Sequence, residues 1–144
     1  SLSQTLSLLI SWYWQKLKNS FMQNEVFKVL TLEEWGQAQD SGIISTEIDQ
    51  KDGFVHLSFL SQLHLTLSLY FDEEEKVMLL QLDQFRIKNK LKFETPILSG
   101  KRLGVFPHYY GQLELSDVSS AWQLKKDAFE VPIEILLKAE ARAN

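Results

Sequence analysis

The sequence predicts an α+β domain, and three observations support this class. Short β-prone runs such as residues 26–30 are interspersed irregularly with segments of helical periodicity. Residues 76–83 are almost continuously apolar, which is typical of a buried central strand. The 144 residues are 44% hydrophobic and 24% charged, an ordinary globular composition for one domain. Regular βαβ alternation is missing, so we do not expect a doubly wound parallel sheet.

The first 21 residues are predicted to form a helical extension, and residues 22–144 a single α+β domain. Five apolar residues recur there at helical spacing, namely Leu6, Leu9, Ile10, Tyr13 and Leu17. The apolar part is far shorter than the roughly 20 residues that a membrane span needs. We therefore expect a docking helix or an ordered extension, with an anchor on a membrane surface as the alternative.

Residues 26–30 then predict a strand that leads directly into a helix. Thr31 is a suitable N-cap, and Glu34 three residues later completes a capping box. The predicted helix covers residues 32–39 and ends before Gly42. Residues 43–48 are expected to cross to a polar turn at residues 49–53, where an Asp-Gly pair favours positive φ.

The rest of the chain predicts further strands around one helix. Residues 54–58 read as a strand, and residues 59–70 have leucines at helical spacing. The remaining predicted strands or extended segments are residues 76–83, 91–94, 105–111, 112–118 and 119–124. Residues 96–104 are expected to form a loop. A C-terminal helix over residues 132–141 has Pro132 in its first turn.

Charge and cysteine content exclude several classes of chemistry. The net charge is −4, which does not favour nonspecific binding to nucleic acid through the whole surface. The chain contains no Cys, which excludes disulfides, thiol nucleophiles and thiolate metal sites and agrees with a cytoplasmic location. A phosphate-binding glycine loop, a zinc-binding His-Glu-x-x-His pair and a nucleophile elbow are also missing.

Two histidine-bearing segments are the candidates for chemistry. On a strand over residues 54–58, Phe54, His56 and Ser58 share one face, while Val55 and Leu57 face the core. In the second segment His108 and Tyr110 again share a face. Such groups can hold a polar ligand, but they can equally be core side chains with satisfied hydrogen bonds.

Two further features are ambiguous from the residues alone. Glu94 ends a short strand and is either a partly buried partner for a histidine or an ordinary surface carboxylate. A basic stripe alternates with apolar residues and comprises Arg86, Lys88, Lys90 and Lys92, followed by Lys101 and Arg102. It can attract a phosphate-bearing ligand or can simply be the solvated face of an edge strand.

The chain resembles the family known as domain of unknown function 952 over about residues 26–113. The strings that support this are Asp52-Gly53-Phe54-Val55-His56-Leu57-Ser58 and Phe106-Pro107-His108-Tyr109-Tyr110-Gly111. Further matching positions are Phe27-Lys28-Val29, Trp35, Asp49, Gln62, Thr66 and Leu91-Lys92-Phe93-Glu94.

The resemblance implies small bacterial and plant proteins without an established activity. It also implies a fold similar to that of ADP-ribosyltransferases, which is a split β-sheet with flanking helices and a cleft that holds NAD. NAD is therefore the cofactor to consider, although the ribose-binding His of those enzymes has no counterpart in residues 27–31 of this chain. Residues 55–58 also look like a string in the RNA 2′-phosphotransferases of that fold.

Together these observations predict a protein that binds a nucleotide-like or phosphorylated ligand, with a transferase reaction as one activity. We expect both histidine segments to border one groove, with His56, Glu94 and His108 as catalytic residues. The ligand-binding set is Lys28, Asp49, Asp52, Gly53, Ser58, Gln62 and Tyr110, with Lys28 contacting phosphate.

Two alternatives remain from the sequence. In the first, the protein is a non-catalytic interaction or structural module that forms a homo-oligomer through its terminal helices. In the second, it is a metal hydrolase that uses His56, His64 and His108.

Overall fold

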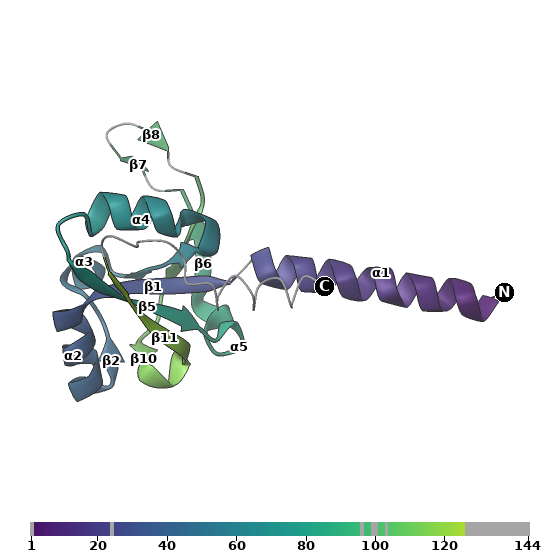
Figure 1. Ribbon diagram of the computed structural model, residues 1–144, viewed down its shortest axis with the longest axis horizontal. Coiled ribbons are helices and arrows are strands. Elements are labelled where there is room, and N and C mark those ends of the chain that lie inside the picture. The colour runs from purple at the N-terminus through teal and green to yellow at the C-terminus, as the bar shows by residue number, and fades with distance from the viewer. Residues whose placement is uncertain (1, 24, 96, 99–100, 103, 126–144) are drawn as a thin grey trace. The chain divides into compact units, whose positions relative to one another are not determined.

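The chain contains two compact units. A computed structural model describes residues 2–23, 25–95, 97–98, 101–102 and 104–125. All the described strands lie in the unit Val26–Glu130, and helix α1 (Leu2–Gln23) belongs to the other unit (Figure 1). The predicted N-terminal helix is confirmed, and its side chains from Leu2 to Tyr13 are exposed. Within the described residues, no helix has the length and hydrophobicity that crossing a membrane requires.

A four-stranded antiparallel sheet forms the centre of the larger unit. Its strands are β1 (Val26–Thr31), β4 (Ser58–Phe59), β5 (Lys76–Leu82) and β11 (Val118–Lys125). Their order is β11-β5-β1-β4, so β5 pairs on both edges (Figure 1). The buried central strand that the sequence predicts over residues 76–83 is confirmed, because every residue of β5 after Lys76 is buried.

A second sheet carries both histidine segments. It has the order β3-β9-β6, with β3 (Val55–His56), β9 (Phe106–Tyr109) and β6 (Leu91–Glu94). The prediction of one strand over residues 54–58 is only partly right, because the chain changes sheets at Leu57. There the Leu57 amide donates to the Pro107 carbonyl at 3.1 Å, and the next residues join the first sheet as β4.

Two further pairs of short strands form separate two-stranded ladders. Strand β2 (Ile43–Ile44) pairs with β10 (Leu113–Glu114), and β7 (Ile97–Leu98) pairs with β8 (Lys101–Arg102). The loop predicted over residues 96–104 therefore contains two short paired strands. The predicted strand over residues 112–118 is interrupted by a 3₁₀ turn, Leu115–Asp117. The predicted helix over residues 132–141 lies outside the described residues.

Helix α2 (Leu32–Ser41) begins and ends where the sequence predicts it. The Thr31 hydroxyl accepts from the Glu34 amide, and the Glu34 carboxylate accepts from the Thr31 amide. Gly42 follows with φ of 79°. The capping box and the left-handed glycine therefore fix both ends of this helix.

Helix α3 (Glu47–Asp52) corrects the prediction of a polar turn at residues 49–53. Thr46 and Asp49 form a second capping box, in which Asp replaces the usual Glu or Gln. The short spacing between this box and Gly53 leaves room for fewer than two helical turns. Gly53 has φ of 80°, so the predicted positive φ is confirmed as the end of a helix.

The remaining helices frame the sheets. Helix α4 (Leu63–Tyr70) follows a 3₁₀ turn at Leu60–Gln62, which confirms the predicted helical segment. The basic stripe is only partly the face of an edge strand. Arg86 lies in α5 (Gln84–Ile87) and the 3₁₀ turn Lys88–Lys90 follows, so within residues 86–92 only Lys92 lies on the edge strand β6. An Asp83 side chain caps α5 by accepting from the Phe85 amide.

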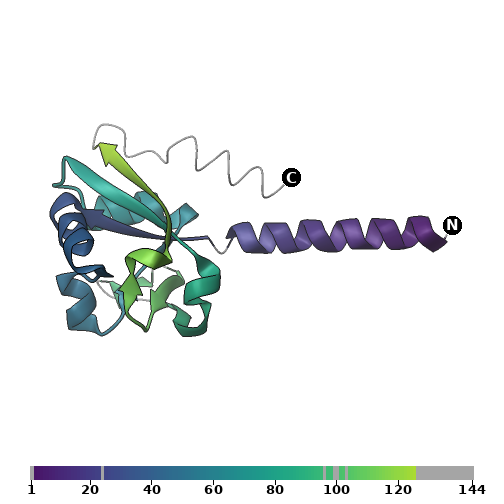
Figure 2. The same cartoon turned by 90° about the horizontal axis from the view of Figure 1, so that it is seen from below.

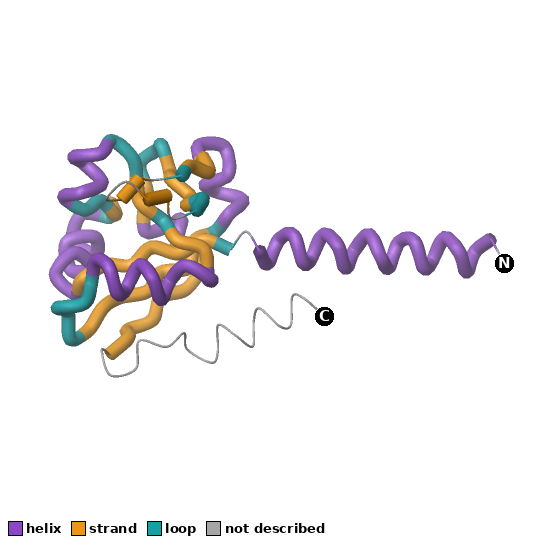
Figure 3. Tube along the Cα trace, turned by 90° about the horizontal axis from the view of Figure 1, so that it is seen from above, coloured by secondary structure: helices purple, strands orange, loops and turns teal. Residues whose placement is uncertain are grey.

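One hydrophobic core connects the sheets and helices of this unit. It includes Leu30 from β1, Leu80 from β5, Tyr109 from β9 and Leu113 from β10. Figure 2 and Figure 3 show the strands of this unit grouped together, with helices around them. The α+β class is confirmed, whereas the likeness to ADP-ribosyltransferases stays a prediction.

Candidate functional site

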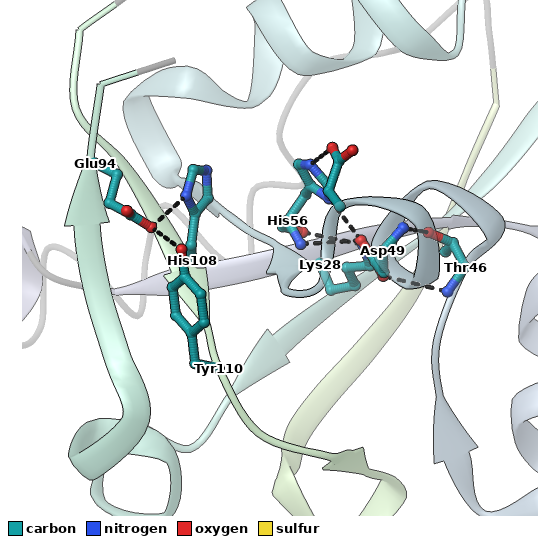
Figure 4. Close-up of polar contacts among 8 residues, drawn as sticks. Lys28, Thr46, Asp49, His56, Glu94, His108 and Tyr110 are labelled. Atoms are coloured by element: carbon teal, nitrogen blue, oxygen red, sulfur yellow. Dashed lines mark hydrogen bonds and ion pairs between the residues drawn. The ribbon is translucent and has the colours of Figure 1, made fainter.

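Strand pairing brings the two histidines together. His56 of β3 and His108 of β9 are direct partners in the antiparallel ladder. Directly opposite residues point to the same face of a sheet, so the two imidazoles become neighbours. Their ring centroids are 5.7 Å apart with an interplanar angle of 65°. Figure 4 shows the two rings next to each other between Glu94 and Asp49.

Both nitrogens of His56 contact carboxylates. Nδ1 lies 2.7 Å from Asp49 Oδ1, and Nε2 lies 2.8 Å from Asp52 Oδ2. An ionised carboxylate only accepts hydrogen bonds, so both contacts are hydrogen bonds when each ring nitrogen carries a proton. The pattern therefore suits a positively charged imidazolium at His56.

Asp49 is the buried anchor of this cluster. Its side chain is 2% exposed and accepts from the Thr46 amide, the His56 amide and the Lys28 ammonium, which approaches to 2.8 Å. Burial alone raises the pKa of Asp49, but the His56 hydrogen bond and the Lys28 charge outweigh it and hold that pKa well below its ordinary range. Asp49 is therefore ionised at neutral pH and orients His56.

Lys28 is almost completely buried next to Asp49. Its ammonium also donates to the His56 carbonyl at 3.0 Å. Burial lowers the pKa of Lys28, while the charge of Asp49 opposes this shift. These contacts connect β1, α3 and β3, so Lys28 holds Asp49 and the His56 backbone in place.

His108 has a different arrangement, because among the described residues only one of its nitrogens has a partner. Nδ1 lies 3.0 Å from Glu94 Oε1 on the neighbouring strand β6. Within the described chain no side chain or backbone group bonds to Nε2. Since Glu94 accepts from Nδ1–H, the neutral ring keeps Nε2 as a proton acceptor.

Glu94 is shared between His108 and Tyr110. The Tyr110 hydroxyl donates to Glu94 Oε1 at 2.6 Å (Figure 4). This bond is the main cause that lowers the pKa of Glu94, and the bond from His108 acts in the same direction. The same contact with Glu94 raises the pKa of Tyr110. Glu94 therefore stays ionised and can orient His108.

Phe54 packs against three rings of the site. Its ring stacks on His108 with centroids 4.1 Å apart, and the centroid distances to His56 and Tyr110 are 4.6 and 5.3 Å. These contacts restrict the rotamers of both imidazoles, so the histidines are oriented by packing as well as by carboxylates.

Both histidines border a cavity of about 600 Å³. Polar groups of its lining include Lys28, Asp52, His56, Ser58 and His108, and much of the rest is apolar. The apolar lining residues include Leu65, Leu69, Tyr70 and Phe71 at the α4 side, together with Phe54 and Phe106. A mostly apolar cavity with a few convergent polar groups is the usual form of a small-molecule site.

The other predicted residues lie around this cavity rather than in its lining. Gln62 accepts from the Phe59 amide at 3.0 Å and donates to the Val105 carbonyl, so it connects the start of α4 to the segment before β9. Gly53 ends α3. Asp49 contacts His56, Glu94 contacts His108, and Tyr110 donates to Glu94. Their predicted catalytic and ligand-binding roles stay predictions.

Ser58 was expected on the same strand face as His56, but it lies in the other sheet. Its hydroxyl is buried and shares a hydrogen bond of 2.7 Å with the Thr66 hydroxyl of α4. This contact fastens α4 to β4 at the cavity wall.

Two other expectations meet little support here. His64 is exposed on α4, and in the described part of the chain no three histidine or acidic side chains form a cluster fit for a metal ion. Of the basic stripe, Lys92 lies nearest to the histidines, because it pairs with His108 in the ladder and its ammonium lies 4.6 Å from the Tyr110 ring centroid. Arg86 contacts Asp117 instead, at 3.5 Å.

Sequence reasoning missed the roles of Thr46, Phe54 and the apolar side of α4. The spacing of Thr46 and Asp49 is a capping-box signal that could have predicted α3. Phe54 lies two residues before His56, and alternation places both on one face, but it does not predict that the Phe54 ring stacks on His108. That α4 would cover this face depends on tertiary packing, and no local pattern contains it.

The fold and the site define an α+β protein with a paired-histidine cavity. The family model described as "Protein of unknown function (DUF952)" matches residues 29–121. The chain belongs to this family.

Solved structures of one protein are similar to the chain. The crystal structure of protein CC0527 from Caulobacter crescentus is 30% identical, with a TM-score of 0.65, covering 78% of this chain and 99% of that one. Its solution NMR structure is 32% identical with a TM-score of 0.60, covering 75% and 90% of the two chains. No curated protein matches the chain.

Proposed function

We propose that the protein binds a small nucleotide-like or phosphorylated ligand in the cavity and uses its two histidines for acid–base chemistry on it. The observation that supports this most is the pairing of the imidazoles. They lie 5.7 Å apart at one cavity, and a carboxylate orients Nδ1 of each. Structural histidines need no such shared opening, whereas a catalytic pair does.

The two histidines have complementary proton chemistry. His108, with Glu94 on Nδ1, can take a proton from a ligand hydroxyl or from water through Nε2. His56, in the doubly protonated form, can donate a hydrogen bond or a proton to an oxygen of the ligand. A transfer reaction needs both steps, because the attacking group loses a proton and the leaving group gains one.

The cavity walls support a ligand that combines a ring or another apolar part with an anionic group. Aromatic and aliphatic side chains such as Phe54, Leu69 and Phe71 can cover a base or a similar ring. Lys92 is outside this lining, but it pairs with His108 in the ladder and places its ammonium over the Tyr110 ring. The earlier prediction that Lys28 itself contacts phosphate remains part of this proposal, although its described contacts go to Asp49 and His56.

Isothermal titration with NAD, ADP-ribose and a 2′-phosphorylated RNA oligonucleotide tests the proposal. We expect saturable binding of at least one of them at one site per chain. His56→Gln and His108→Gln should weaken it about ten-fold or more, since each removes a charge-assisted or oriented hydrogen bond. His64→Gln is the matched control, because His64 is exposed on α4. Absence of heat with all three ligands would contradict the proposal.

One observation favours a second function, an interaction module that self-associates through α1. Leu6, Leu9 and Tyr13 are exposed and lie on one side of the helix. Light scattering of the Leu6→Ser/Leu9→Ser double variant would show a lower mass than the unmodified protein. Equal masses would remove this candidate.

A further inference from the structure

The two carboxylates that contact His56, those of Asp49 and Asp52, differ greatly in how firmly the rest of the protein holds them. Asp49 is buried and accepts from four different donor groups, one of them the buried Lys28 ammonium. Moving Asp49 would leave Lys28 buried without its counter-charge, which is strongly unfavourable. Asp49 is therefore a fixed part of the site.

Asp52 is held by a single contact. Its side chain is 37% exposed, and its one hydrogen bond in the described structure is to His56 Nε2. It is the last residue of α3, directly before Gly53. An exposed ion pair of this kind contributes little to stability, so Asp52 can exchange His56 for water at low cost.

The contact between Asp52 and His56 Nε2 lies at the wall of the cavity. Asp52 and His56 are both lining residues, and the His108 ring is adjacent. A group that replaces the Asp52 carboxylate on His56 Nε2 therefore lies beside residues that line the cavity.

The charges explain which group would replace it. With His56 doubly protonated, Lys28 and His56 carry two positive charges against the one negative charge of Asp49, so these three groups have a net charge of +1 when Asp52 moves away. Glu34, another acid of the lining, accepts from the Thr31 amide at 2.9 Å, and its charge acts on Lys28. An anionic oxygen is the group that replaces Asp52 on the protonated Nε2, because it restores the charge-assisted hydrogen bond.

We propose that Asp52 occupies the anion subsite of the ligand-free protein, and that a phosphate or carboxylate of the ligand displaces it from His56 Nε2. This rests on the proposed function and deepens it, because it locates the anionic group of the ligand. Asp52 is thus a competitor of the ligand, whereas the sequence analysis placed it among the residues that bind the ligand.

The test compares Asp52→Ala with the unmodified protein, with inorganic phosphate as the probe. Imidazole nitrogen shifts in two-dimensional ¹H–¹⁵N NMR report on each histidine during the titration. We expect phosphate to shift the His56 Nε2 resonance. The affinity for phosphate should be about three- to ten-fold tighter in Asp52→Ala, because no carboxylate has to leave Nε2 before phosphate binds. His64 is the internal control and should not respond.

Two more variants keep the test decisive. Glu47→Gln removes a charge from the same helix without touching His56 and should change the phosphate affinity less than about two-fold. Asp52→Asn serves if the alanine variant does not fold. Unchanged or weaker phosphate binding in both Asp52 variants would overturn the proposal.

The outcomes for the two proposals are separable. If the unmodified protein binds ADP-ribose or NAD but the Asp52 variants gain no phosphate affinity, only the subsite proposal fails. If the Asp52 variants gain phosphate affinity while no nucleotide binds, the anion subsite stands and the nucleotide class is wrong.

Discussion

At the scale of single residues, the Lys28–Asp49–His56 cluster shows how a buried charge can serve both stability and function. Asp49 is surrounded by donors from β1, from the start of α3 and from β3. The same bonds that stabilise the fold orient the His56 ring toward the cavity. Substitutions here will therefore affect stability and ligand binding together.

Asp49→Asn is expected to lower the free energy of unfolding by about 3 kcal/mol, because it leaves the buried Lys28 ammonium without its counter-charge. Urea denaturation at neutral pH measures the difference. Asp52→Asn is the matched control and should cost less than about 1 kcal/mol, since its ion pair is exposed. Equal costs for both variants would contradict the role of Asp49 as the buried anchor.

The stability difference between unmodified protein and Asp49→Asn should depend on pH. The pKa of Asp49 is depressed in the folded state, so its contribution is fully present above the pKa of the unfolded chain, about 3.9. It is lost as pH falls from there toward the folded-state pKa. Denaturation of both proteins at successive acid pH values should show the difference shrinking below about pH 4, and a constant difference would be inconsistent with this linkage.

At the scale of elements, α3 and its terminal glycine determine where the His56 segment begins. Thr46 and Asp49 cap its first turn, and Gly53 turns the chain into the segment that carries Phe54 and His56. This geometry places Asp49 and Asp52 on the two nitrogens of a histidine only a few residues later. A short helix with two precise ends thus builds half of the site.

Gly53→Ala is expected to destabilise the protein by about 1–2 kcal/mol through its positive φ alone, because an added Cβ meets no atom within 4 Å. Gly36→Ala is the opposite control. Gly36 lies inside α2 without positive φ and with equal free space, so this variant should stabilise by about 0.5–1 kcal/mol. Thermal unfolding distinguishes the two signs, and a neutral Gly53→Ala would argue against the left-handed helix end.

The elements also show which local sequence signals were sufficient to predict a helix or a strand. Thr31, Glu34 and Gly42 predicted α2 correctly, since a capping box and a C-terminal glycine act within one helical turn. The same signal around Thr46 went unused because Asp stands where Glu is usual. The alternation of the basic stripe suggested a strand. Asp83 instead caps the short helix α5, so the start of the stripe is helical.

At the scale of the whole molecule, Leu57 connects the two main sheets. The chain leaves the histidine-bearing sheet after His56 and enters the central sheet at Ser58. Leu57 itself is buried, and its amide bonds to the Pro107 carbonyl of β9. Leu57 and the Lys28 bond to the His56 carbonyl together fix the position of His56 relative to the central sheet.

Leu57→Ala should cost about 2–4 kcal/mol, because it removes a buried side chain from the junction of the sheets. Leu69→Ala, at an exposed position of α4, is the control and should cost less than about 1 kcal/mol. Urea unfolding followed by circular dichroism measures both. If Leu57→Ala were as mild as its control, the junction would not hold the sheets together.

The sequence by itself determined the α+β class, most helices and strands, and the residue types of the site, because capping, periodicity and turn chemistry act over a few residues. Only the tertiary structure decided that His56 lies opposite His108, that the chain changes sheets at Leu57, and that α4 closes one side of the cavity. Those outcomes depend on strand register and on packing between segments 40 or more residues apart, as Gln62 and Val105 show. Local sequence patterns do not specify contacts between such distant segments, so the partners of each histidine are known only from the folded chain.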